Sequence, residues 1–293
     1  MTYFPNYLKD YPNMDTSSPL HISLNTLFNG YPAHRHDFLE LSYVVEGTGS
    51  EVINGVKHPM LPGTLTFLLP YQIHEIITSP GSKLVLYNCM FSMDLLVKHT
   101  LDRDHWVMEM LDNNDAYPPF LQLQGREAER MRERLVEMIK EYKDNRPGRD
   151  ALLKSILTEV LVRFDRGRRE HKLTDTEAAA RLNFNSKSWA IIRYIQTHFQ
   201  DEDLMLSALA EHFSLSASRI SEIVKETTGQ TFLNFLHDLR IRHAGSLLAS
   251  TEMSVIEIAS EVGFGSYKTF SRVFRERKKV IPTEYRRNLQ QLK

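Results

Sequence analysis

The feature that most constrains the fold is a stretch near the C-terminus, residues 254–285, which encodes two short helices joined by a tight turn. Ser254 and Glu257 form an S-x-x-E capping box, so a helix is predicted to begin there. Gly263 stands where a left-handed residue would end that helix near Val262, because glycine has no Cβ to clash at positive φ. The predicted apolar stripe of this helix consists of Ile256, Ile258, Ala259 and Val262.

A second helix is predicted after the turn. The Phe264 side chain is expected to fill the inside of the turn, and Ser266 is expected to be the N-cap of the helix. Its buried face recurs at i, i+3 and i+4 as Phe270, Val273 and Phe274. Two helices joined by a glycine-containing turn, the second polar and basic outward, are typical of a helix-turn-helix. The outward residues, which we therefore predict to contact DNA, are Tyr267, Lys268, Ser271, Arg272 and Arg275.

Basic residues are concentrated in this part of the chain. From Ser266 to the C-terminus there are nine Lys or Arg and two Asp or Glu, a local charge of +7, whereas the whole chain has a formal net charge of −1. Such a patch suits the neutralisation of DNA phosphates. We predict that Arg272, near the middle of the outward face, contacts a guanine and that Arg275 contacts a phosphate. The alternative is a solvated basic helix face without a partner.

An earlier copy of the same pattern spans residues 206–235, offset by 49 residues before the turn and by 50 after it. Its apolar positions that match the later copy are Leu209, Ala210, Leu215, Ile220, Ile223 and Val224. Ser216 is predicted to cap the second helix of this copy. The outward residues of that helix, also predicted to contact DNA, are Ser218, Arg219, Ser221, Glu222 and Lys225. Glu222 is expected either to accept from a cytosine amine or to restrain Arg219.

The two copies differ at the position that ends the second helix. Gly229 is expected to close the first copy as a left-handed cap, but Lys279 stands at the equivalent place, so the later helix is expected to end without one. Between the copies, apolar residues keep helical spacing over residues 231–249, with charge at Arg240 and Arg242. This predicts a rigid connecting helix, which would hold the two recognition helices about 34 Å apart for successive major grooves.

Residues from about 187 to 290 resemble the DNA-binding domain of the AraC/XylS family of transcription regulators. The residues at the family's positions are Leu209-Ala210, Thr228-Gly229, Arg240, Ala244, Leu247-Leu248, Ile258-Ala259, Gly263-Phe264, Phe270-Ser271-Arg272, Phe274, Pro282 and Tyr285-Arg286. The chain departs from the family at Lys279, where glycine is usual, and at Lys268 with Thr269, where Ser-Tyr is more frequent. The first departure bears on the terminal cap and the second on base contacts, and neither affects the expected fold.

Upstream, residues 20–93 form short alternating runs separated by turn residues, which predicts a small β-barrel or sandwich. Asn54-Gly55 indicates a two-residue hairpin, because both central residues of a type I′ turn need positive φ. One strand is predicted from about residue 34 to residue 45, and its period of two places His34, His36 and Glu40 on one face.

The spacing Gly30-x3-His34-x-His36-x3-Glu40-x6-Gly47, followed by Pro62-Gly63 and His74, resembles the two motifs of the cupin barrel. In metal-binding cupins the matching residues hold a divalent ion, so the resemblance admits Mn, Fe or Zn. The alternatives are residues that line an effector pocket and histidines with a purely structural role. We predict that His34, His36, Glu40 and His74 bind an effector, with no metal and no other cofactor.

Two amphipathic helices are predicted after the barrel. The first spans residues 126–142, and the second is expected to be capped by Asp150 and to be apolar on one edge as far as Phe164. They either pack on the barrel or dimerise, and we predict a homodimer. Residues 165–188 are charged and poorly periodic, which predicts a flexible interdomain linker.

The single cysteine, Cys89, lies in an apolar strand-like run and is predicted to be a small buried side chain in a reducing compartment. The N-terminus lacks a cationic segment followed by an apolar one, and no window approaches about 18 uninterrupted apolar residues. We therefore predict a soluble cytoplasmic protein without a membrane partner.

The predicted fold class is α+β with several domains: a cupin-like sensing domain at 1–95, a helical dimerisation segment and linker at 96–186, and an all-α DNA-binding domain at 187–293. The helix-turn-helix units are placed at about 206–229 and 254–279. These features predict a transcription regulator that binds promoter DNA and responds to a small effector. The family resemblance implies a sugar or related metabolite, and RNA polymerase as a further partner of an activator.

The alternative class is a metal-dependent cupin enzyme tethered to a DNA-binding domain, favoured only by the three histidines and the glutamate. We predict no enzymatic activity and no catalytic residues. A purely architectural DNA-binding protein is disfavoured because the barrel would then have no role.

Overall fold

The computed structural model describes residues 6–8, 10–14, 16, 18–97, 106–112, 117–144, 146–170 and 188–291. Contacts between residues divide the chain into two compact units, residues 1–14 with 20–185 and residues 15–19 with 186–293. Each unit has its own hydrophobic core. Among the helices of these described ranges, none is both long enough and apolar enough to cross a membrane.

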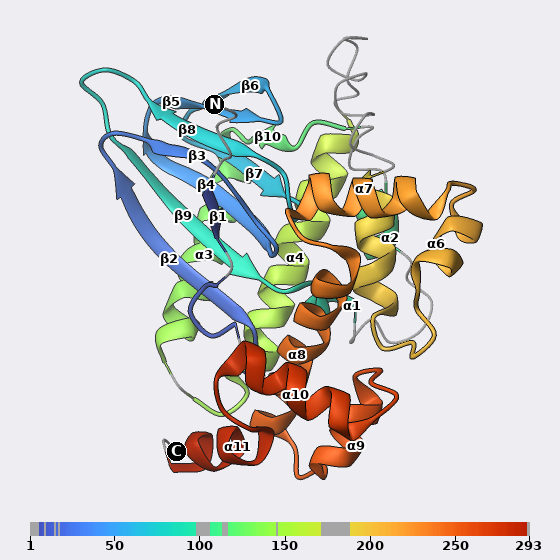
Figure 1. Ribbon diagram of the computed structural model, residues 1–293. Coiled ribbons are helices and arrows are strands. Elements are labelled where there is room, and N and C mark those ends of the chain that lie inside the picture. The colour runs from blue at the N-terminus through green and yellow to red at the C-terminus, as the bar shows by residue number, and fades with distance from the viewer. Residues whose placement is uncertain are drawn as a thin grey trace. The chain divides into compact units, whose positions relative to one another are not determined.

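The first unit contains a β-sandwich of two five-stranded sheets (Figure 1). One sheet has the order β1-β3-β8-β5-β6, formed by Asn6–Leu8, Tyr31–His36, His74–Thr78, Gly49–Ile53 and Val56–Met60. The other has the order β10-β7-β4-β9-β2, formed by Phe120–Gln122, Thr64–Leu68, Leu39–Gly47, Leu84–Phe91 and Leu20–Leu27. The cupin-like β domain is therefore confirmed.

The predicted hairpin connects β5 and β6. Asn54 has φ 49° and Gly55 has φ 83°, the two left-handed residues that a type I′ turn requires. Ile53 pairs with Val56 on either side of this turn. On β9, Cys89 is fully buried, as predicted, and burial raises the pKa of its thiol.

The prediction of one strand through residues 34–45 is wrong. β3 ends at His36 and β4 begins at Leu39, and the two strands belong to different sheets. The chain turns the corner at Asp37 and Phe38, where the Phe38 ring packs edge-on against Tyr11 at 4.9 Å. The strand alternation stops there because Phe38 is anchored between elements that are distant in sequence.

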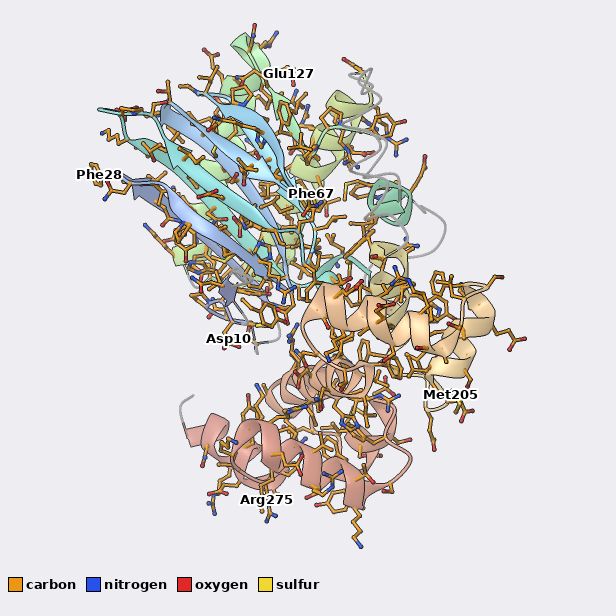
Figure 2. All side chains as sticks on the ribbon, turned by 45° about the horizontal axis from the view of Figure 1, so that its top comes forward. Asp10, Phe28, Phe67, Glu127, Met205 and Arg275 are labelled. Atoms are coloured by element: carbon orange, nitrogen blue, oxygen red, sulfur yellow. The ribbon has the colours of Figure 1, made fainter. Side chains whose placement is uncertain are left out.

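Two long helices pack on the β10-β7-β4-β9-β2 sheet: α3, Gly125–Lys143, and α4, Arg149–Arg169 (Figure 1). The Tyr43 hydroxyl donates to the Ala128 carbonyl at 2.9 Å, and the Phe67 ring meets Phe164 edge-on at 5.8 Å. Figure 2 labels Phe67 on this sheet. The buried residues of α3 include Met131, Leu135 and Met138, so the apolar stripe of α3 is used inside the unit.

Both ends of α4 differ from the prediction. The N-cap is Gly148 at φ 83°, and Asp150 lies in the first turn, so Asp150 is not the cap. The helix continues to Arg169 instead of giving way to a linker at residue 165. Arg168 explains the extension, because its side chain is fully buried and donates to Asp165 and to the Met110 carbonyl of α2, Trp106–Asp112. Residues 171–187 of the predicted linker lie outside the described residues. The short helix α1, Met93–Val97, follows β9.

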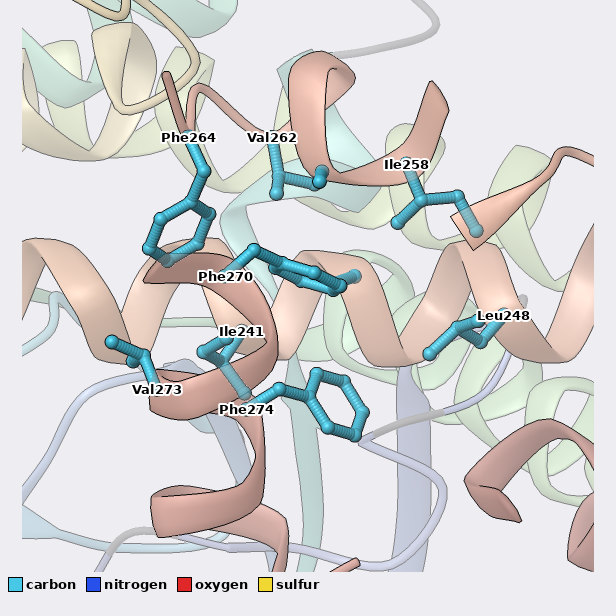
Figure 3. Packing of buried hydrophobic residues seen from close by; sticks show 10 residues of the cluster. Ile241, Leu248, Ile258, Val262, Phe264, Phe270, Val273 and Phe274 are labelled. Atoms are coloured by element: carbon cyan, nitrogen blue, oxygen red, sulfur yellow. The ribbon is translucent and has the colours of Figure 1, made fainter. Parts of the chain in front are cut away.

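The second unit is all-helical and contains both helix-turn-helix copies, which confirms that part of the fold class. After a helix at residues 188–198, its elements are α6 Leu206–His212, α7 Ala217–Thr228, α8 Phe232–Ser250, α9 Val255–Glu261, α10 Tyr267–Lys278 and α11 Pro282–Gln291. The connecting helix α8 contacts both α7 and α10. Figure 3 shows the core that α8, α9 and α10 share. Its members include Ile241, Leu248, Ile258, Val262, Phe264, Phe270, Val273 and Phe274.

The predicted helix boundaries in this unit are largely confirmed by the caps. Ser216 and Ser266 each accept from a backbone N–H three residues on, and Ser254 with Glu257 forms the full capping box. One stripe residue was assigned wrongly: Ile256 is 67% exposed, because α9 buries Ile258 and Ala259 instead.

The expectation that α10 ends without a left-handed residue is also wrong. Gly229 adopts φ 76° after α7, and Lys279 adopts φ 64° after α10. The backbone N–H of Lys279 donates to the Arg275 carbonyl, as that of Gly229 does to the Lys225 carbonyl. The second copy therefore keeps the same cap with a residue that has a Cβ.

Arg240 was predicted only as a charged residue of the connecting helix. Its side chain is buried and links α8 to the segment of residues 199–201. Its guanidinium donates to the carbonyls of Phe199 and Asp201 at 2.7 and 2.8 Å and lies 5.5 Å from the centre of the Phe264 ring. Gly263 borders the same contact, since a Cβ there would lie 2.6 Å from the Gln200 carbonyl oxygen. Arg240 and Gly263, two residues that match the resembled family, thus both lie in close contact with the backbone of residues 199–201.

Candidate DNA interface and effector cavity

The two recognition helices present all ten predicted DNA-contacting residues away from the core. On α7 the exposed or half-exposed residues are Ser218, Arg219, Ser221, Glu222 and Lys225. On α10 they are Tyr267, Lys268, Ser271, Arg272 and Arg275. Figure 2 labels Arg275 at the outer face of the unit. The opposite faces of both helices are buried, which orients these side chains outward.

The two outward faces carry different charge. α7 has two cations and two carboxylates, whereas α10 has five cations and one carboxylate. Arg277 of α10 is used inside the unit, because it bonds Asp238 at 2.6 Å and Asn234 at 3.0 Å on α8. Within the described part of the chain, Lys268 and Arg275 have no ion-pair partner.

Two of the arginines predicted to contact DNA are paired on their own helix. Arg219 lies 2.5 Å from Glu222, and this hydrogen bond raises the pKa of the Arg219 guanidinium. Arg272 lies 2.7 Å from Glu276. The pairs orient the planar guanidinium groups before any DNA is bound.

In the first unit, a cavity of about 390 Å³ is lined by strands of both sheets. Its polar wall includes His34, Glu40 and His74, three of the four predicted effector residues, together with Asn25 and Asn88. Its apolar lining includes Leu8, Leu27, Phe38, Ile76, Leu86 and Met90. The fourth predicted residue, His36, is fully buried and does not line this cavity, but its Nε2 lies 3.2 Å from Oε2 of Glu40.

All three histidines use their Nδ1 atom for a hydrogen bond within the protein. The Nδ1–H groups of His34 and His36 donate to the carbonyls of Pro32 and Phe38 at 2.9 Å, and that of His74 donates to Glu51 at 3.1 Å. Each Nε2 is therefore the atom left for other partners. Nε2 of His74 is buried without a hydrogen-bond partner among the described residues, whereas Nε2 of His36 faces the Glu40 carboxylate.

A row of buried polar residues continues from the cavity across the β3-β8-β5-β6 part of the sheet. His34 pairs with His74 across β3 and β8, and Glu51 pairs with His58 across β5 and β6. Glu51 links the two pairs, with its carboxylate 3.1 Å from His74 Nδ1 and 3.4 Å from His58 Nε2. Sequence reasoning missed Glu51, His58 and Asn88.

Burial and these bonds set the charges around the cavity. Burial, assisted by the nearby His74, lowers the pKa of His34 to about 4, so its neutral form is favoured. Burial alone would raise the pKa of Glu51, but its bonds to His58 and His74 outweigh this effect and lower the pKa to about 2. Glu40 likewise has a lowered pKa despite burial, because His36 bonds to it. Burial disfavours the charged form of His74, yet its bond to Glu51 raises its pKa.

The donor set also fits a divalent transition ion. The ligand atoms of His34, His36 and His74 lie within 4.8 Å of one another, and each ring has its other nitrogen fixed by an oxygen. Glu40 would add a carboxylate oxygen to these three imidazoles, a combination that suits Zn, Fe or Mn. Such an ion would supply a positive charge and open coordination positions at the cavity wall.

A β-sandwich with a cavity lined by both of its sheets, followed by two helix-turn-helix units, is the architecture of a DNA-binding regulator with a ligand-binding domain. Residues 28–161 match the model of the AraC-like ligand binding domain, and residues 209–288 match the model of a helix-turn-helix domain. The chain belongs to the AraC family of DNA-binding transcription regulators, and members of this family are regulators, not enzymes.

Known proteins similar to the chain include the HTH-type transcriptional activator RhaS of Escherichia coli (strain SE11). It is 27% identical over 256 residues, which is 87% of this chain and 87% of that protein. The C-terminal domain of AraT, a response regulator from Geobacillus stearothermophilus, is 35% identical and covers 35% of this chain and 84% of its own, with a TM-score of 0.34. The apo form of a lysine-to-alanine variant of ToxT from Vibrio cholerae strain SCE256 is 14% identical, covers 91% of this chain and 96% of its own, and has a TM-score of 0.43.

Proposed function

We propose that the protein is a transcriptional activator whose sandwich cavity binds an uncharged, polyhydroxylated effector such as a sugar. The observation that carries the proposal is the cavity of about 390 Å³ with His34, Glu40, His74 and Asn88 in its wall. A volume of this size lies within the usual range for small-molecule sites. The similarity to the RhaS activators supports activation as the mode of action.

The effector class follows from the hydrogen-bonding capacity of the wall. The Glu40 carboxylate, Nε2 of neutral His34 and the unpartnered Oδ1 of Asn88 are all acceptors. A ligand rich in hydroxyl donors would satisfy them, and an unsatisfied buried acceptor is costly. The negative charge of Glu40 opposes a phosphate or a carboxylate on the ligand, whereas the charges favoured on His74 and Glu51 offset each other.

The first test is a thermal-shift series with full-length protein and matched sugars, sugar phosphates and sugar acids. A neutral sugar that binds only the folded state should raise the midpoint of unfolding by mass action, and the charged analogues should not. Glu40→Gln should remove the shift by weakening binding. Glu46→Gln is the matched control, because Glu46 lies on the same strand with a 62% exposed side chain paired to Lys83. Stabilisation by the phosphates or acids alone would show that the proposed class is wrong.

At the other unit, we propose that α7 and α10 contact promoter DNA through the ten outward residues named above, and that the activator contacts RNA polymerase. The protein would act in the cytoplasm, where promoter DNA and metabolites meet. A homodimer through α3 and α4 is also proposed. Their outer faces expose Val136 and Leu152, at 45% and 41%, among charged residues. Sedimentation equilibrium of the wild type and of Val136→Glu with Leu152→Glu tests it, since a monomeric wild type excludes the dimer.

A second candidate function is metal-dependent effector binding, which the close approach of ring nitrogens of His34, His36 and His74 favours. Metal analysis of the purified protein, followed by chelation before the same thermal-shift series, separates the two. A sugar-induced shift that survives chelation supports direct binding, and one that returns only with Zn, Fe or Mn supports the metal.

A further inference from the structure

The carboxylate of Glu276 holds the arginine that we expect to contact a base. Oε1 of Glu276 lies 2.7 Å from an Nη atom of Arg272, one helical turn earlier, and both side chains are more than half exposed. Lys268 and Arg275, on the same outward face, have no ion-pair partner within the described ranges. The single carboxylate of α10, that of Glu276, is therefore paired with Arg272 and not with Lys268 or Arg275.

Helix stability does not account for Glu276. It lies in the last turn of α10, where the negative end of the helix dipole disfavours an acidic side chain. It also follows its arginine by four residues, and an acidic residue stabilises a helix better when it precedes the basic one. An exposed pair of this kind contributes little to stability in any case.

We propose that Glu276 is a specificity-determining residue, which restrains Arg272 and so keeps it from contacting phosphates on DNA that lacks the preferred base. On the preferred sequence, the restrained guanidinium takes a guanine edge with two parallel donors. On other sequences, the same guanidinium would have to leave Glu276 to reach a phosphate, and Glu276 itself is repelled by the backbone. The Glu276 carboxylate thus weakens binding to DNA that lacks the preferred base, so the protein discriminates between sequences through an unfavourable contact.

This inference rests on the proposed base contact of Arg272. The experiment first selects a preferred duplex from random DNA with the full-length wild-type protein, and a scrambled duplex of the same length and composition serves as the non-specific probe. Affinities for both are then measured at several salt concentrations for Glu276→Gln, Arg272→Ala and the double variant. Glu211→Gln is the matched control: Glu211 is exposed on α6 and has no ion-pair partner in the described chain.

Glu276→Gln should strengthen binding to the scrambled duplex more than binding to the selected one, lowering the specificity ratio by about two- to fivefold. The salt dependence on scrambled DNA should steepen by about one unit, because Arg272 gains a phosphate contact. Both effects should vanish in the Arg272→Ala background, which isolates the part that acts through Arg272. The control should change both affinities by the same small factor.

An unchanged specificity ratio in Glu276→Gln overturns the proposal. A gain on scrambled DNA that persists without Arg272 also overturns it, because the carboxylate would then act on phosphates directly. The failure of the base contact itself is distinguishable, since Arg272→Ala would then leave the specificity ratio of the otherwise wild-type protein unchanged.

Discussion

Replacing Lys279 with glycine is expected to stabilise the C-terminal unit. Lys279 has φ 64°, a left-handed conformation that costs an L-residue with a Cβ about 1–2 kcal/mol. Glycine removes that cost but gives the unfolded chain more freedom, which offsets about 0.4–1 kcal/mol. The midpoints of these two ranges leave a net gain of about 0.8 kcal/mol, which corresponds to a rise of about 3–6 °C in the unfolding midpoint of a unit of this size.

The assay uses the position of the two tryptophans. Trp189 is 8% exposed in the C-terminal unit and Trp106 lies in α2 of the first unit, so a Trp106→Phe background makes fluorescence report the C-terminal unit. Lys279→Ala is the control, because it removes the exposed bond from Nζ to the Glu276 carbonyl but keeps the Cβ. Gly229→Ala, the same change in reverse in the first copy, should destabilise by about 1 kcal/mol or more. Equal midpoints for Lys279→Gly and Lys279→Ala would refute the argument from backbone strain.

Three further outcomes are expected. Arg272→Ala should relax discrimination at one base pair by about 1–3 kcal/mol, whereas Arg275→Ala should weaken all sequences alike and reduce the salt slope by about one; affinities for single-base variants at several salt concentrations measure both. The pKa of His34 in the folded state, about 4, lies below its ordinary 6.5, so its contribution to stability is full above pH 6.5 and lost as the pH falls towards 4; His34→Asn should flatten urea midpoints across that window. Gly263→Ala should cost more than about 1–2 kcal/mol in urea unfolding, because the left-handed backbone and the Gln200 carbonyl both oppose a Cβ; a smaller loss would show that the backbone there shifts freely.

The C-terminal unit was predictable because its signals are local. Capping serines, the Gly263 turn and helical spacing each act within a few residues. The same kinds of signal occur in both copies of the repeat, so each copy supports the prediction for the other. The left-handed Lys279 was not predictable from its own residue type. The matching position of the first copy, Gly229, is also left-handed, so the backbone of the repeat requires this conformation. Packing of the flanking helices holds Lys279 in it despite its side chain.

The sandwich was predictable in class but not in the path of one strand. An alternating pattern continues through Asp37 and Phe38, yet the chain changes sheets there, because Phe38 finds its partners in Tyr11 and Met14, which are distant in sequence. The buried Glu51–His58 pair could have been found. A two-residue turn at Asn54-Gly55 fixes the register, and counting outward from it places these two residues opposite each other.

The two helix-turn-helix copies share a backbone but differ in the side chains that would face DNA. Arg219 corresponds to Thr269, and Glu222 corresponds to Arg272, at the constant offset of 50 residues. Base contacts depend on these side chains, whereas the caps and buried positions that the copies share set only the position of the helix. Since α7 is also neutral where α10 is strongly basic, the first copy gains less from phosphates and depends more on its base contacts. One chain is therefore expected to bind two different base sequences in succession, so its site on DNA is not a tandem repeat even though the protein segment that binds it is one.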